Sequence, residues 1–119
     1  MTTSTNTSKQ EYRDLVNLLV RIICKQIGIH KIPVIYYSPK DWHKVHRCNS
    51  KYNKEKFYGL TCTECKGIAV NLEARDHTSI LELVNTIAHE LAHLKFPDKG
   101  EGKEFENIII GIVRGKRYK

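Results

Sequence analysis

The stretch TIAHELAHL, residues 86–94, decides how this chain is organised, because it places the pattern H-E-x-x-H inside an apolar-periodic segment. The apolar positions recur at steps of three and four, which predicts an amphipathic helix with one buried stripe. These positions are Ile80, Leu83, Val84, Ile87, Leu91 and Leu94. His89 and His93 are four residues apart, so they lie on the same helical face, beside the buried stripe.

This spacing predicts a metal centre. Two imidazoles four residues apart on a helix can share one Zn²⁺ ion. Glu90 follows the first histidine and can reach a metal-bound water as general base. The alternative is a pair of surface histidines without a ligand. The placement beside an apolar stripe favours the metal centre, with His89 and His93 as ligands and Glu90 as the catalytic base.

A catalytic zinc ion usually has three protein ligands and a water, so two histidines are not enough. No histidine follows His93, and the downstream carboxylates are Asp98, Glu101, Glu104 and Glu106. Glu101 is the favoured ligand, because a turn over 97–100 can fold the chain back toward the metal, and Glu104 is second. The alternative is that Glu101 is a solvated acid in the first turn of a helix.

The remaining sequence predicts a single domain over 9–119 after a polar leader, 1–8, that is expected to be disordered. The predicted helices span 9–27, the metal-binding segment as far as Lys95, and 103–114, and the predicted strands span 33–37, 57–61 and 67–72. Thr78 or Asp76 is the expected N-cap of the metal-binding helix. The segment 40–56 between the first two strands is polar and irregular.

The composition points to a cytoplasmic protein without a membrane partner. The 119 residues include no apolar run near the ~20 residues that cross a bilayer, and the first ten lack an apolar signal region. The formal net charge of +7 is compatible with binding to DNA or to acidic partners, and equally with simple solubility. No base-reading motif is visible, and the oligomeric state is not predicted.

The chain has four cysteines. Cys24 falls on the apolar face of the first predicted helix and is expected to be a small buried hydrophobe. The other three are Cys48, Cys62 and Cys65, and His43 and His46 precede them. A second, structural zinc site, a disulfide and free thiols are all compatible with these cysteines, and the irregular spacing does not choose among them.

The histidine motif and the residues after it resemble a known group of enzymes. HELAHL at 89–94, followed by EGKEF at 101–105, resembles the SprT-like metallopeptidases and their WLM relatives, which read H-E-L-x-H and then H-G-K-x-F. Gly102, Lys103 and Phe105 match as they stand, whereas Glu101 occupies the place of the third zinc histidine. Two histidines and one glutamate form the gluzincin arrangement, and the small size resembles the minigluzincins. The resemblance covers about 67–110.

The resemblance implies a zincin-like α+β domain, with a small, twisted, mostly antiparallel sheet packed on three helices that include the H-E-x-x-H helix. It implies a zinc metalloendopeptidase whose peptide or protein substrate lies extended beside an edge strand. That strand is expected to be 68–72, so Ile68, Ala69, Val70 and Asn71 are the candidate substrate-binding residues. The candidates for stabilising the oxyanion are His43, His46, Tyr52 and Tyr58. SprT-like relatives degrade DNA-bound proteins, although the C-terminal zinc ribbon of some relatives is absent.

Two other functional classes compete with a peptidase. One is a latent or non-catalytic module that zinc stabilises, with the basic tail 114–119 folded over the cleft. A disordered, solvated tail is the simpler expectation for that segment. The other is a basic nucleic-acid-binding protein in which zinc is incidental.

Overall fold

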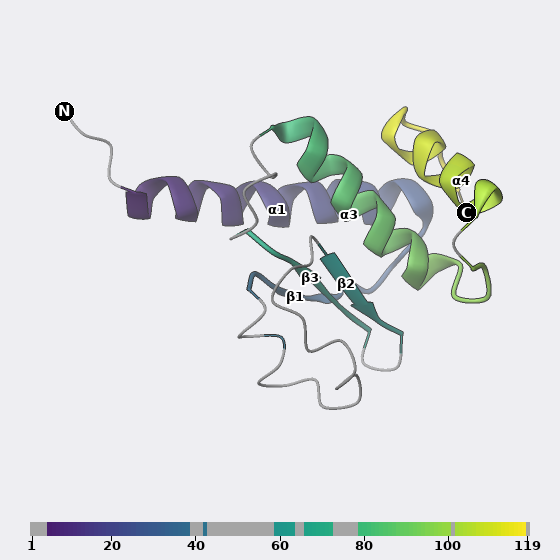
Figure 1. The fold of residues 1–119 in the computed structure, drawn as a ribbon, viewed down its shortest axis with the longest axis horizontal. Coiled ribbons are helices and arrows are strands. Elements are labelled where there is room, and N and C mark those ends of the chain that lie inside the picture. Colours follow the sequence, from purple (N-terminus) through teal and green to yellow (C-terminus); the bar gives the residue numbers. More distant parts are fainter. Residues whose placement is uncertain are drawn as a thin grey trace.

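The computed structural model describes residues 5–38, 42, 59–63, 66–72, 79–100 and 102–118 of the chain. This part forms a small α+β domain of three helices and a three-stranded sheet, as the sequence predicts (Figure 1). The elements are α1 (Thr5–Ile27), β1 (Val34–Tyr36), β2 (Gly59–Cys62), β3 (Gly67–Val70), α3 (Ile80–Lys95) and α4 (Lys103–Val113). None of the described helices is long and apolar enough to cross a bilayer.

The sheet is mixed, with the strand order β1-β3-β2. Strand β3 pairs in parallel with β1, where Ile35 is opposite Ile68, and antiparallel with β2, where Leu60 is opposite Ala69. The expectation of a mostly antiparallel sheet is therefore wrong for the described strands. The connection from β1 to β3 includes all of β2 and is long enough for the chain to return in the direction of β1.

The alternation of side chains along β3 separates two apolar clusters. Ile68 and Val70 are fully buried in the main core, which the helices build on one side of the sheet. Ala69 points to the other face and packs with Trp42 and Cys62. Figure 1 shows α1 and α3 on the same side of the sheet, with α4 beside α3. Helix α3 is thus the central element, because it packs against α1, α4 and the sheet.

The ends of the helices differ from the predicted positions at two places. Helix α1 begins at Thr5, so residues 5–8 of the expected leader belong to this helix. The N-cap of α3 is Ser79, not Thr78 or Asp76, which lie outside the described residues. The Ser79 side chain accepts a hydrogen bond from the backbone N–H of Glu82 at 3.2 Å. This bond satisfies one of the free amides of the first turn and fixes where the helix starts.

The C-terminal segment packs onto the end of α1. The side-chain amide of Gln26 donates to the carbonyl oxygens of Ile112 at 2.8 Å and Lys116 at 2.6 Å. The backbone N–H of Tyr118 donates to the Gln26 carbonyl oxygen at 3.0 Å, and its ring meets Phe96 edge to face. As far as Tyr118, these hydrogen bonds hold the tail against the end of α1.

Cys24 is fully buried in the main core, which confirms its predicted role as a small hydrophobe. Burial raises the pKa of the Cys24 thiol from 9.0 to about 11, because the thiolate is poorly solvated there. The thiol is therefore protonated in the folded protein at neutral pH.

Two leucines in the first turn of α3 test the packing of this helix. Leu83 is fully buried and Leu81 is 67% exposed. We expect Leu83→Ala to lower the free energy of unfolding by about 2–5 kcal/mol, because it leaves a cavity between α3 and the core. The matched change Leu81→Ala should cost under about 0.5 kcal/mol. Urea unfolding followed by circular dichroism measures both, and equal losses would contradict the observed rotation of α3.

Candidate metal centre

His89 and His93 lie one turn apart on α3, and their Nε2 atoms are 3.2 Å from each other. The two rings meet edge to face, with their centroids 4.8 Å apart. A tetrahedral zinc ion with Zn–N bonds of 2.0–2.1 Å separates two ligand nitrogens by roughly 3.3–3.4 Å. The separation of the imidazoles is close to the one that a shared zinc ion requires, and it also allows one ring N–H to donate to the other ring nitrogen.

Phe105 of α4 holds both rings in this arrangement. Its side chain is 1% exposed and stacks on His93 with a centroid distance of 4.4 Å and an interplanar angle of 24°. It meets His89 edge to face at 5.3 Å. A buried ring in contact with both imidazoles restricts their rotation, so α4 prepares the pair for a common ligand.

Glu90 points toward the sheet and is only 6% exposed. The Thr61 hydroxyl of β2 lies 2.5 Å from its carboxylate Oε1 and 3.0 Å from its backbone carbonyl oxygen. A buried carboxylate needs such hydrogen-bond donors, because burial removes its hydration. Strand β2 is thus the element that fixes the Glu90 side chain.

Gly59 of β2 leaves the space that Glu90 occupies. A Cβ atom at Gly59 would lie 2.7 Å from Oε2 and 2.8 Å from Cγ of Glu90. Gly59 and Thr61 lie on the same face of the strand because side chains alternate there. Sequence reasoning placed a strand here but assigned neither residue to the site. A glycine inside a strand was the available signal, since it often marks a close approach.

The predicted substrate strand is wrong in one respect. Strand β3 is central, so β1 and β2 already take up the hydrogen-bonding groups of both its edges. Ile68, Ala69 and Val70 are fully buried, and Asn71 is 3% exposed. The expected edge position of this strand is therefore wrong among the described strands, whereas substrate binding by these residues stays a prediction. Among the described strands, β2 is the outer strand next to Glu90. The error arose because local alternation identifies a strand but not its neighbours.

The third metal ligand stays a prediction. Glu101 lies outside the described residues, although the next residue, Gly102, lines the same groove as His89. The carboxylate of Glu104, the second candidate, is exposed and pairs with the Lys99 ammonium at 3.0 Å. In the part of the chain that the structure describes, no three metal-binding side chains converge. The described site therefore consists of the two imidazoles, and the assignment of Glu101 rests on the sequence alone.

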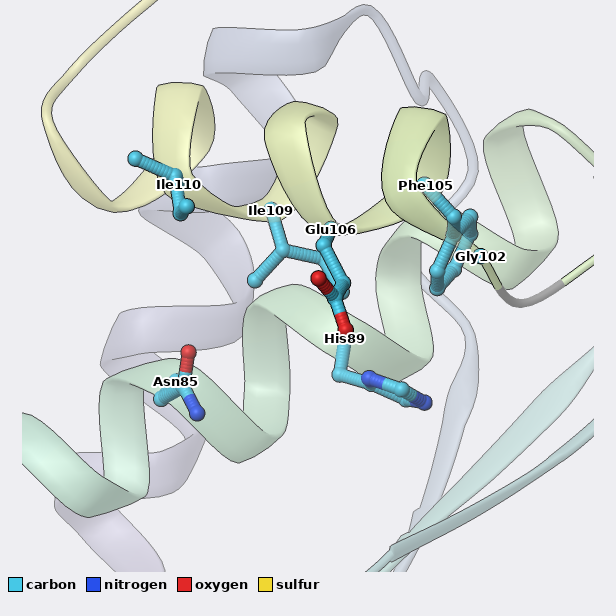
Figure 2. Close-up of a pocket in the computed structure, with 7 residues that line it drawn as sticks. All are labelled: Asn85, His89, Gly102, Phe105, Glu106, Ile109 and Ile110. Carbon is cyan, nitrogen blue, oxygen red and sulfur yellow. The ribbon is translucent and has the colours of Figure 1, made fainter.

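A groove of about 410 Å³ adjoins the histidines, between α3 and α4. Figure 2 shows its lining, which consists of Asn85, His89, Gly102, Phe105, Glu106, Ile109 and Ile110. Sequence reasoning named Glu106 only as one of four downstream acids. It did not identify the groove, because the angle between two helices is not encoded by the periodicity of either.

Most of the cysteine and oxyanion candidates lie outside the described residues. They are His43, His46, Cys48, Tyr52, Tyr58 and Cys65. Cys62 is buried in the Trp42 cluster. A second zinc site and a disulfide are therefore still predictions.

Comparison of the chain with protein-family models, with curated proteins and with solved structures finds no match. The geometry of the described residues is consequently what supports a function.

The contact between β2 and Glu90 can be tested with a double-mutant cycle. We expect Gly59→Ala to lower the free energy of unfolding by about 1–3 kcal/mol, because the new methyl group overlaps the buried Glu90 side chain. In a Glu90→Ala background the same change should cost under about 0.5 kcal/mol, because the overlapping atoms are gone. Urea titrations of the four proteins measure the coupling. An equal cost in both backgrounds would show that Glu90 does not pack on Gly59.

Proposed function

We propose that this protein is a zinc-dependent metallopeptidase of the gluzincin type, with His89 and His93 as two ligands and Glu101 as the third. The observation that carries the proposal is the 3.2 Å separation of the two Nε2 atoms, held by a buried phenylalanine. Two imidazoles and one carboxylate form a donor set that suits zinc and leaves one position open. A zinc ion bound there supplies Lewis acidity to water and to a substrate carbonyl.

Glu90 is the proposed general base. It takes a proton from the attacking water and passes it to the leaving amine. Its carboxylate is ionised for the first step, and the Thr61 hydroxyl, at 2.5 Å, is the donor that stabilises this form. Gly59 allows the carboxylate to stay against β2. Packing against Gly59 and the hydrogen bond from Thr61 thus both hold the base.

The proposed substrate is an extended peptide beside β2, which replaces β3 in this role. Strand β2 is antiparallel to β3 and carries Thr61, the hydrogen-bond partner of Glu90. A peptide paired with the outer edge of β2 would pass close to the base. Main-chain hydrogen bonds would bind such a peptide with little sequence selectivity. The net charge of +7 is compatible with acidic or nucleic-acid-associated targets.

A second candidate function is a latent or non-catalytic module that zinc stabilises. The observation that favours it is the burial of Glu90, whose side chain is 6% exposed and hydrogen-bonded. A base held in this way has to become accessible to water before it can act. Zinc binding without hydrolysis by the wild-type protein would support this alternative.

The base assignment predicts a separation of metal binding from turnover. We expect Glu90→Gln to keep its zinc and to hydrolyse denatured casein at least roughly 100-fold more slowly, because proton transfer is lost. His93→Ala should lose zinc as well as activity. The matched control is Glu104→Gln, since that carboxylate is exposed and pairs with Lys99. Metal analysis and casein digestion with and without chelator give both readouts, and full activity of Glu90→Gln would exclude Glu90 as the base.

The third ligand is tested by zinc affinity alone. Glu101→Ala should weaken zinc binding by roughly 10-fold or more, because two imidazoles remain. Glu104→Ala should leave the affinity unchanged. Competition with a chromogenic chelator measures both variants. Unchanged affinity in Glu101→Ala would remove this residue from the ligand set.

A further inference from the structure

The groove between α3 and α4 begins at the metal centre. His89 contributes both to the imidazole pair and to the wall of the groove. Figure 2 shows Asn85 one turn away from His89 along α3, facing α4, and Glu106 reaching from α4 toward α3. Its volume of about 410 Å³ lies within the roughly 300–1,000 Å³ range of ligand-binding pockets. A side chain of a substrate at the metal centre can therefore extend into this groove.

The charge of the groove is opposite to that of the whole protein. The chain has 20 lysines and arginines against 13 acidic residues. Among the described residues, no lysine or arginine lines the groove, whereas Glu106 does. Its carboxylate makes no ion pair within the described ranges, unlike that of Glu104 two residues earlier, which binds Lys99. Glu106 thus presents an uncompensated negative charge beside the histidines.

The rest of the lining suits a long aliphatic stem. Phe105, Ile109 and Ile110 form the apolar wall on α4, and the Ile110 side chain is 49% exposed. Lysine and arginine place their methylene groups along such surfaces and keep the charged head with polar partners. The Asn85 amide oxygen is a second acceptor on the opposite wall.

From these observations we propose that the α3–α4 groove is a recognition site for a cationic side chain, an ammonium or guanidinium group on an aliphatic stem. Glu106 binds the cation, the Asn85 amide oxygen is a second acceptor for it, and Ile109 and Ile110 contact the stem. The inference rests on the proposed function only in assigning that side chain to a peptide substrate. The peptide would carry lysine or arginine next to the bond placed at the metal centre.

A binding experiment tests the groove without any turnover. The probes are the N-acetyl methylamides of lysine and of norleucine, which share a four-carbon stem and differ in the ammonium group. The readout is the shift of the Asn85 side-chain amide in the NMR spectrum of the labelled protein. We expect the lysine probe to bind about fivefold more tightly than the norleucine probe, as a partly solvated charge pair allows. Glu106→Gln should remove this preference.

Glu104→Gln is the matched control, because it removes the same charge from the same helix outside the groove. It should keep the fivefold preference. Equal binding of the two probes to the wild-type protein, or an unchanged preference in Glu106→Gln, would overturn the proposal. Loss of zinc from Glu106→Gln would also overturn it, because the carboxylate would then be a metal ligand.

Digestion of a peptide library separates this inference from the proposed function. We expect cleavage beside lysine or arginine by the wild-type protein and loss of that preference in Glu106→Gln at unchanged zinc content. Zinc-dependent cleavage without preference for basic residues, together with equal probe binding, would leave the peptidase proposal standing and overturn the groove assignment. Selective lysine binding without any hydrolysis would leave the groove assignment standing and overturn the peptidase proposal.

Discussion

The packing of α3 against the core is the constraint on which the candidate site depends. Leu83, Ile87 and Leu91 are fully buried, and their burial fixes the rotation of the helix about its axis. Once that rotation is fixed, the histidine face is directed toward α4 and the Glu90 side chain toward β2. The apolar stripe therefore determines which side chains of α3 face α4 and β2. Any other rotation would separate the imidazoles from Phe105 or expose the buried carboxylate.

The two neighbours of α3 restrain different parts of the site. Helix α4 provides Phe105, whose ring contacts both imidazoles and keeps their Nε2 atoms close. Strand β2 provides a hydroxyl donor and a glycine, which give the buried carboxylate a hydrogen-bond partner and the space it occupies. A buried acid is costly without such partners, so the contacts with β2 offset part of the cost of burying Glu90. The groove between α3 and α4 adds the negative charge of Glu106, whereas the net charge of the chain is +7.

Much of the fold could be predicted from local patterns. The helices end within a residue of the predicted positions at Ile27, Lys95 and Val113, because the 3.6-residue periodicity stops there and Gly28 or a turn follows. The described strands also overlap the predicted segments 33–37, 57–61 and 67–72. The N-cap was misplaced because several residues before α3 are good caps, and only the folded backbone selects Ser79.

The sequence by itself determined the composition of the α3 face, namely two imidazoles one turn apart with an acid next to the first, because helical spacing is a local property. It did not determine which strand would meet that acid. Strand order depends on pairing between segments far apart in the chain, and only the tertiary structure placed β3 in the centre and β2 beside Glu90. For the same reason, the contacts of Gly59 and Thr61 with Glu90 and the acidic groove between α3 and α4 followed from packing and not from any motif.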